Sequence, residues 1–244
     1  LTHEVKSGRV KSVGLSNFSL EDSDFFLDHL PPGSLRAIQH EYSLFDRSAE
    51  DSFLPWADSN GISFVGYSPL DQGQIIGGGP PLERLRALAK EERCTVGQLA
   101  LKWLLLHSSA FLIPSTSRVE RMEEFAKLDG VTLSTETREE IARLSEGARK
   151  ILRLSEIDVV PDASERRRVY RSLAEALANP AQFSPSPSQL AQALLVGTDL
   201  KPIRVRLEHR GGKENFLLSE GRIRYWANMI AFGPNHEVEV LVRY

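Results

Sequence analysis

The sequence predicts an α/β protein made of two domains, residues 1–147 and residues 151–244. Over the first 146 residues, short apolar segments rich in β-branched and aromatic side chains alternate with longer amphipathic segments. The connections between them are short, as in a parallel sheet whose helices pack on its outside. Near Gly147 the alternation stops and a different order of strands and helices begins. We therefore expect a parallel α/β sheet followed by a smaller α/β domain.

Four segments of the first domain are predicted to be strands because each is apolar, β-rich and too short for a helix. They span residues 11–16, 35–42, 62–67 and 111–114. Four strand–helix units correspond to half of a (β/α)8 TIM-type barrel, which typically takes about 250 residues when complete. A half barrel leaves two open strand edges, so we expect a homodimer or a complementing half.

Several helices are predicted from side chains that can cap a helix start. Ser19 precedes the first helix of the strand–helix pattern, and Ser134 the last helix of this domain. Thr95-x-x-Gln98 and Ser117-x-x-Glu120 match the capping box, in which two side chains three residues apart bond free backbone N–H groups. The segment 77–81, rich in Gly and Pro, predicts a loop.

The second domain is predicted to mix strands and helices. Residues 151–160 alternate like a strand, and a helix over 164–178 would carry the run Arg166–Arg168. The remaining expected elements are helices 188–196 and 220–232 and strands 202–207, 216–218 and 238–242.

Charge and composition argue against some classes of protein. Thirty Lys and Arg against 33 Asp and Glu give a net charge of −3, so a nucleic acid partner is not expected. No apolar run is long enough to span a bilayer, so no membrane partner is expected. Cys94 is the single cysteine, which makes a reducing, cytoplasmic location the expectation. The first residue is Leu1 rather than Met, so an incomplete chain is also considered.

Polar side chains follow three of the predicted strands at the point where the apolar pattern stops. They are Ser16, Asn17, Gln39, Tyr67 and Ser68. Amide groups beside an aromatic face suit a planar ring that carries a carboxamide. Two alternatives stay open: Asn17 as a helix cap, and Gln39 as a satisfied interior residue.

The fourth strand leads into a helix whose start suits an anion. Pro114-Ser-Thr-Ser117 is followed by Arg118, Arg121 and Glu124, so backbone donors, hydroxyls and guanidinium groups come together. A phosphate would fit there. A capped surface helix with ordinary charge pairs accounts for the same residues and stays open as well.

Taken together, four motifs in residues 5–146 resemble the C-terminal half of the aldo-keto reductase family. They are Val10-Lys-Ser-Val-Gly-Leu-Ser-Asn-Phe18, Gln39-His-Glu-Tyr-Ser-Leu44 with Asp46-Arg47, Tyr67-Ser-Pro-Leu-x-Gln-Gly73 and Ile113-Pro-x-Thr-Ser-Arg-x-Glu-Arg121. The resemblance implies a barrel that binds NADP(H) and reduces a small-molecule carbonyl substrate.

The resemblance also implies which residues bind the cofactor. Those expected at the nicotinamide are Ser16, Asn17 and Gln39 on the carboxamide and Tyr67 stacked on the ring. Those expected along the pyrophosphate are Ser68, Leu70 and Gln72. Those expected at the adenosine are Thr116, Ser117 and Arg121 on the 2'-phosphate and Glu124 near the adenine.

This chain departs from the family pattern in ways that bear on activity. Phe125 stands where the family often has Asn, and Ser115 where Gly or Lys is usual. The family's catalytic Tyr, Lys, Asp and His lie on the first four barrel strands, which are absent here. We therefore expect no catalytic residue in this chain, and a complementing N-terminal half as its partner.

The second domain resembles the ParB N-terminal/sulfiredoxin-like domain. The segments that carry the resemblance are Leu200-Lys-Pro-Ile-Arg-Val-Arg206, Phe216–Ala227 and 238–242. It implies a nucleotide-binding site, for CTP or ATP, at Glu220, Gly221, Arg222 and Arg224. The open alternative is that these arginines are solvated and only Trp226 and Ile230 pack a core.

Two hypotheses follow for the whole chain. The first is an NADP-dependent oxidoreductase that requires its missing half. The second is a nucleotide-binding regulatory module, in which the half barrel is a scaffold.

Overall fold

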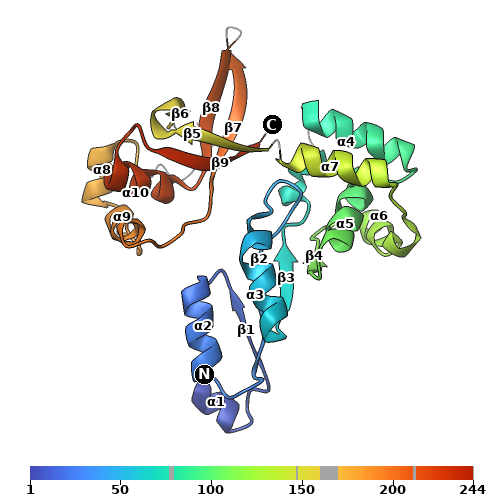
Figure 1. Cartoon of the computed structure of the whole chain (residues 1–244), viewed down its shortest axis with the longest axis horizontal. Helices are drawn as coiled ribbons and strands as arrows, with labels where there is room; N and C mark the ends of the chain where they lie inside the picture. The colour runs from blue at the N-terminus through green and yellow to red at the C-terminus, as the bar shows by residue number, and fades with distance from the viewer. Residues whose placement is uncertain (77–79, 147, 160–169, 211–212, 244) are drawn as a thin grey trace. The chain divides into compact units, whose positions relative to one another are not determined.

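The computed structural model describes residues 1–76, 80–146, 148–159, 170–210 and 213–243 (Figure 1). They form two compact units, Leu1–Leu144 and Ser145–Tyr244, and each is described by itself. Two predicted features lie outside the described residues: most of the Gly- and Pro-rich loop, at 77–79, and the Arg166–Arg168 run.

Unit 1 contains one parallel sheet of four strands. The strands are β1 (Val13–Ser16), β2 (Leu35–Glu41), β3 (Ser63–Tyr67) and β4 (Phe111–Ile113), in the order β1-β2-β3-β4. All three neighbouring pairs are parallel. The predicted parallel α/β sheet is therefore confirmed. β4 is the shortest of the four, and it ends directly before Pro114, which has no backbone N–H to donate.

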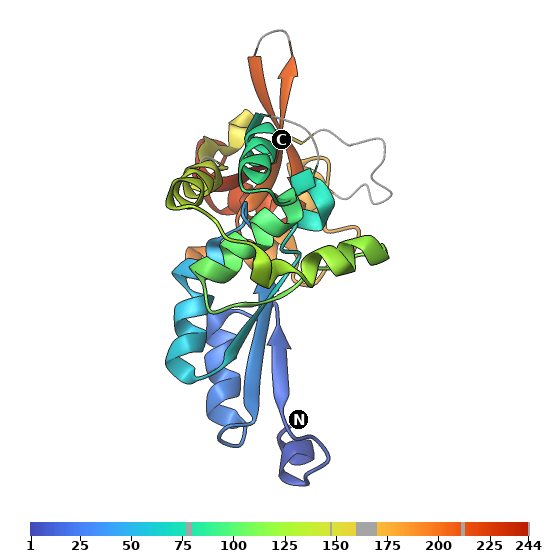
Figure 2. The ribbon, with the colours of Figure 1, turned by 90° about the vertical axis from the view of Figure 1, so that its right-hand side faces the viewer.

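Helices connect and cover these strands. They are α1 (Thr2–Lys6), α2 (Leu20–His29), α3 (Phe53–Asn60), α4 (Pro80–Glu91), α5 (Val96–His107), α6 (Val119–Phe125) and α7 (Thr135–Glu146). Short 3-10 helices occur at η1 (Ser48–Asp51), η2 (Asp71–Ile76) and η3 (Leu128–Gly130). Figure 2 shows α2 and α3 on the same side of the strands. None of the described helices is long and apolar enough to cross a bilayer.

The two faces of the sheet differ in burial. Leu15, Ile38 and Phe64 are register partners and belong to the apolar core, with 5%, 0% and 2% of their surface exposed. Burying side chains of this kind is the main favourable term in folding. This face of the sheet therefore forms part of the hydrophobic core of unit 1.

The opposite face carries Ser16, Gln39, Val65 and Phe111, which are partners across the four strands. Phe111 is 64% exposed, and Ile113, two residues further along the same strand, is 45% exposed. Side chains two residues apart on a strand point to the same face. The face that holds the predicted nicotinamide residues thus also exposes two large apolar side chains.

One predicted capping box is confirmed and the other is wrong. The Thr95 hydroxyl accepts the N–H of Gln98 at 3.1 Å, and the Gln98 side chain accepts the N–H of Thr95 at 3.2 Å. By contrast, α6 starts at Val119, and no side chain caps it. The Thr116 hydroxyl accepts the N–H of Arg118 at 3.1 Å instead. This side-chain bond lies before the start of α6 and does not involve Ser117, the residue that the predicted capping box requires.

Replacing Thr95 by Ala should destabilise unit 1 by about 1 kcal/mol, the usual cost of losing an N-cap side chain. Ser117→Ala is the matched control, and it should change stability by no more than a few tenths of a kcal/mol, as an ordinary surface substitution does. Urea unfolding of the two variants measures the difference. An equal loss in both would mean that Ser117 caps α6 after all.

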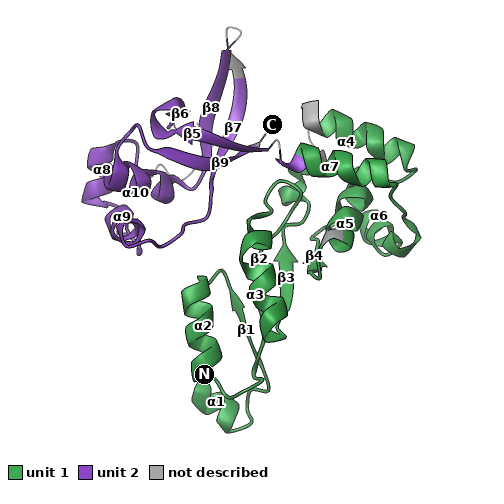
Figure 3. Cartoon of the chain, viewed as in Figure 1, with its two compact units in different colours: residues 1–144 green, residues 145–244 purple. Residues whose placement is uncertain are grey.

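Unit 2 is built on a mixed sheet of five strands (Figure 3). Its order is β5 (Arg149–Arg153), β9 (Glu237–Arg243), β7 (Ile203–Arg210), β8 (Lys213–Glu220) and β6 (Ile157–Asp158). Its helices are α8 (Leu173–Ala178), α9 (Pro187–Leu195) and α10 (Arg222–Phe232). The core includes Val205, Val240 and Trp226.

The single strand predicted over 151–160 is wrong. A 3-10 turn, η4 (Leu154–Glu156), separates β5 from β6. Leu154 is fully buried, and its N–H bonds the carbonyl of His236 at 3.0 Å. The chain turns at η4, where Leu154 is buried, so the residues after the turn do not continue β5. They form β6, which pairs with β8 instead.

Candidate functional site

The predicted nicotinamide residues meet at the carboxyl ends of β1, β2 and β3. The N–H of Asn17 donates to the carbonyl of Gln39 at 3.0 Å. The Tyr67 hydroxyl donates to Asn17 Oδ1 at 2.9 Å, although fifty residues separate the two. Ser16 is the register partner of Gln39, and its hydroxyl accepts from the Asn17 side chain at 3.3 Å. Amide, hydroxyl and aromatic groups therefore come together at one sheet edge.

Asn17 does not cap the following helix. Ser19 is the N-cap of α2, and its hydroxyl accepts the N–H of Asp22 at 3.0 Å. Asn17 instead has a φ of 61°, in the left-handed region that few residues other than Gly adopt. The alternative interpretation of Asn17 as a helix cap is thus wrong.

The turn after β3 concentrates backbone strain. Ser68, Asp71 and Gln72 have φ values of 51°, 49° and 54°, and Gly73 follows at 87°. Each such non-Gly residue costs on the order of 1–3 kcal/mol, and such residues cluster at ligand sites. Leu70 is 7% exposed and belongs to the core, so its side chain packs inside and only its backbone faces the turn.

Thr116, Ser117 and Arg121 lie beyond the end of β4. Because Ile113 is the register partner of Tyr67, this segment leaves the sheet at the same edge as the turn after β3. Arg121 is partly buried. Within the described ranges it has no ion pair or side-chain hydrogen bond. Its guanidinium group is therefore available for an anion.

Glu124 is engaged in helix packing. The Thr95 hydroxyl donates to its carboxylate, and the Gln98 side chain donates to its backbone carbonyl at 2.8 Å. A Cβ on Gly97 would lie 3.1 Å from Glu124 Oε1, so α5 and α6 approach closely here. The role expected for Glu124 near an adenine stays a prediction. Sequence reasoning missed this contact, because the Thr95 motif indicates only a cap.

Polar side chains near the end of β2 form a structural network. The Tyr42 hydroxyl donates to Glu50 at 2.7 Å, and Arg47 pairs with the same carboxylate at 2.6 Å. Burial raises the pKa of Tyr42 well above its ordinary value, so this phenol stays protonated. His40 stacks on Phe53 with ring centroids 3.7 Å apart. These contacts provide polar and aromatic partners for buried side chains of unit 1.

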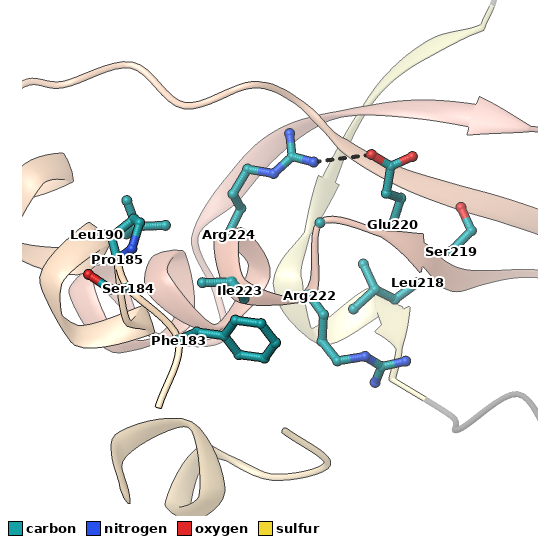
Figure 4. Close-up of a pocket in the computed structure, with 11 residues that line it drawn as sticks. Phe183, Ser184, Pro185, Leu190, Leu218, Ser219, Glu220, Arg222, Ile223 and Arg224 are labelled. Carbon is teal, nitrogen blue, oxygen red and sulfur yellow. Dashed lines mark ion pairs between the residues drawn. The ribbon is translucent and has the colours of Figure 1, made fainter. Parts of the chain in front are cut away.

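The four predicted nucleotide-binding residues of unit 2 border one cavity of about 500 Å³ (Figure 4). Its lining is completed by Phe183, Ser184, Pro185, Leu190, Leu218, Ser219 and Ile223. Sequence reasoning missed the wall formed by Phe183 and Leu190, because the local pattern of residues does not show which segments pack beside the start of α10.

Charged groups beside this cavity are already paired. Arg204, whose side chain is 5% exposed, donates to Glu220 at 2.7 Å. Arg224 donates to the carbonyls of Lys201 and Pro202, both at 2.9 Å, and lies 3.7 Å from Glu220. Gly221 has a φ of 90°, and a Cβ there would lie 3.0 Å from the Arg224 guanidinium. The backbone conformation therefore favours glycine at this position, and another residue would also displace the Arg224 side chain.

Comparison with known families assigns the first part of the chain. The sequence model of the aldo/keto reductase family matches residues 1–146. The chain belongs to the aldo/keto reductase family. The parallel sheet of unit 1 and the polar residues at its strand ends lie within this match. The ParB-like resemblance of residues 151–244 lies beyond it and stays a prediction.

Individual oxidoreductases show similarity to this chain over part of their length. A protein named NADH-specific methylglyoxal reductase, from Escherichia coli, is 29% identical over 72% of this chain and 52% of its own length. An uncharacterised oxidoreductase of Schizosaccharomyces pombe is 33% identical over 54% of this chain and 41% of its own length. The chain thus spans about half the length of these curated relatives.

Among solved structures, an aldo-keto reductase from Klebsiella pneumoniae in complex with NADPH is 26% identical, with a TM-score of 0.53. The match covers 59% of this chain and 51% of that one. The fold of unit 1 is therefore that of part of an aldo/keto reductase.

Proposed function

We propose that this chain carries the cofactor-binding side of an NADP(H)-dependent carbonyl reductase. The observation that carries the proposal is the meeting of Asn17, Gln39 and Tyr67 at the ends of three neighbouring strands. Their amide edges match a carboxamide, and the Tyr67 ring offers a face to a planar ring. NADPH, when bound, supplies the hydride for carbonyl reduction.

The other predicted residues would bind the remaining parts of the cofactor. Ser68, Leu70 and Gln72 would lie along the pyrophosphate, where the strained turn presents backbone groups. Thr116, Ser117 and Arg121 would hold the 2'-phosphate, because hydroxyl and guanidinium groups bind phosphate oxygens well. Glu124, which lies near the end of α6, would be close to the adenine. The substrate would be a small carbonyl compound.

In this function, unit 1 would form one half of a barrel, and a second half would complete it. The exposed Phe111 and Ile113 support it, because their face of the sheet would become the barrel interior. A complementing N-terminal half or a second copy of this chain would supply the other strands. We assign no catalytic residue to the chain as given, so the general acid would come from the completing half. We place the protein in the reducing cytosol, since Cys94 is its single cysteine.

Titration of the chain with NADPH, followed by the cofactor's fluorescence, tests this function. Tyr67→Leu should weaken binding roughly three- to tenfold, because an aromatic pair contributes about 0.5–1.5 kcal/mol beyond the area it buries. Tyr67→Phe keeps the ring and loses only the bond to Asn17, so it should bind nearly as the unaltered chain does. Failure of the unaltered chain to bind NADPH would refute the proposal.

A second candidate function is nucleotide binding by unit 2. The observation that favours it is the cavity bordered by Glu220, Gly221, Arg222 and Arg224, with an apolar wall opposite. In this alternative, residues 151–244 are a ParB-like regulatory module, and the half barrel is a scaffold. Nucleotide binding by the full chain, and its loss in Arg222→Ala, tests this function.

A further inference from the structure

Two helices of unit 1, α5 and α6, are joined by side chains at one end of each. The Thr95 hydroxyl, which caps the start of α5, also donates to the carboxylate of Glu124 near the end of α6. The Gln98 side chain donates to the backbone carbonyl of Glu124 at 2.8 Å. The end of α6 is therefore fixed to the first turn of α5 through Glu124.

Two further features favour this place for the carboxylate. The start of a helix carries a partial positive charge, which attracts an anionic group. In addition, Gly97 leaves room for the carboxylate, because a Cβ at this position would lie 3.1 Å from Glu124 Oε1. A contact that short is tighter than ordinary, so a side chain at position 97 would displace the carboxylate.

Arg121 lies three residues before Glu124 on α6. Acidic and basic side chains at this spacing on a helix are neighbours, with Cβ atoms about 5–6 Å apart, and commonly pair. In the part of the chain that the structure describes, the Glu124 carboxylate binds Thr95, and no ion pair joins it to Arg121. The ion pair at the start of α6 joins Arg118 to Glu120 instead, at 3.9 Å. The positive charge of Arg121 is thus not neutralised by the carboxylate nearest to it along the helix.

We propose that Thr95 determines the cofactor preference of this chain by holding the Glu124 carboxylate away from Arg121. The inference rests on the function proposed for unit 1, in which Arg121 binds the 2'-phosphate of NADP(H). A guanidinium group that is already paired with a carboxylate binds a phosphate more weakly than one that is not. Thr95 acts through Glu124 and Arg121, so it is a positioning residue. NADH has no 2'-phosphate, and its affinity should not depend on Thr95.

Fluorescence titration of the full chain with NADPH and NADH tests the inference. Thr95→Val removes the hydroxyl at nearly constant volume, so Glu124 can turn toward Arg121. The affinity for NADPH should then fall roughly two- to fivefold, the strength of a partly exposed ion pair, while that for NADH stays the same. Thr95→Ser keeps the hydroxyl and should keep both affinities. A loss of stability alone would not change the ratio of the two affinities.

Two more variants test the path through Glu124. In the double variant Thr95→Val/Glu124→Gln, the neutral amide cannot neutralise Arg121, so the affinity for NADPH should return to that of the unaltered chain. Gly97→Ala should lower the affinity for NADPH as Thr95→Val does, because its methyl group displaces the carboxylate. This variant keeps the cap of α5, and alanine favours a helix more than glycine does, so α5 should not be weakened.

Ser134→Ala is the matched control, because Ser134 bonds in the same way directly before α7. Its hydroxyl accepts the N–H of Thr137 at 3.2 Å and donates to the Glu92 carboxylate at 2.6 Å. The variant loses a similar pair of bonds elsewhere in unit 1, and it should leave the affinities for NADPH and NADH unchanged. A loss of NADPH affinity equal to that of Thr95→Val would mean that any such damage to unit 1 suffices, and it would overturn the inference.

The remaining outcomes separate this inference from the function on which it rests. No NADPH binding by the unaltered chain would refute both. An NADPH affinity that is unchanged in Thr95→Val, that falls equally with the NADH affinity, or that Glu124→Gln does not restore would overturn the inference and keep the function. An equal loss of both cofactors in Glu124→Gln alone would assign the carboxylate to the adenine, which both cofactors share, and would overturn the inference as well.

Discussion

Replacing Arg121 by Glu should weaken NADPH binding on the order of 100-fold and leave NADH binding nearly unchanged. NADPH differs from NADH by the 2'-phosphate, which is the group we assign to Arg121. A hydrogen bond to a charged group contributes about 1.5–3 kcal/mol, and the new carboxylate adds repulsion between like charges. Fluorescence titration with both cofactors measures the ratio.

Arg118→Glu is the matched control for this prediction. Arg118 lies three residues before Arg121, and its side chain is 65% exposed and 3.9 Å from Glu120. The two substitutions change the net charge equally, so their difference isolates the position of the guanidinium. Equal loss of NADPH affinity in both variants would show that the affinity depends on the net charge of the protein and not on the position of the Arg121 guanidinium. Equal loss of NADPH and NADH affinity in Arg121→Glu would instead point to damage to the fold.

Much of unit 1 could be predicted from the sequence because its signals are local. Short β-rich segments ended by polar residues or by proline predict where each strand stops, and β3 ends at Tyr67 as expected. In a parallel sheet the carboxyl ends of neighbouring strands share one edge, so the meeting of Asn17 with Tyr67 follows from the order of the strands. The residue pattern alone is thus enough to group the nicotinamide residues.

Contacts between elements distant in sequence could not be predicted in this way. The Thr95 motif predicts only a cap for α5, yet the Thr95 hydroxyl also donates to Glu124 on α6. The break after β5 depends on Leu154, whose burial is decided by packing within unit 2. In the same way, Phe183 joins a candidate site only because the loop before α9 lies beside the start of α10. Local periodicity carries no information about these pairings.

The packing around Gly66 is another such contact, and it leads to the second large effect that we expect. Gly66→Ala should destabilise unit 1 by about 1–3 kcal/mol, the usual cost of overpacking a core. A Cβ at this position would lie 3.0 Å from Tyr42 Cβ and 3.1 Å from Leu112 Cδ2. Neither neighbour can withdraw easily, because Tyr42 is fully buried and bonded to Glu50, and Leu112 lies on the adjacent strand.

Gly14→Ala provides the comparison, since Gly14 is also a strand glycine. A Cβ there would meet Ala37 at 3.5 and 3.8 Å, which is ordinary contact distance. Urea unfolding followed by tryptophan fluorescence, in a Trp226→Phe background that limits the signal to unit 1, measures both variants. Gly66 precedes Tyr67, so the strand shift that relieves the clash should also weaken NADPH binding, while Gly14→Ala should preserve it. Equal stabilities in the two variants would mean that β3 has room between Tyr42 and Leu112, and the position of the Tyr67 ring would then not depend on this packing.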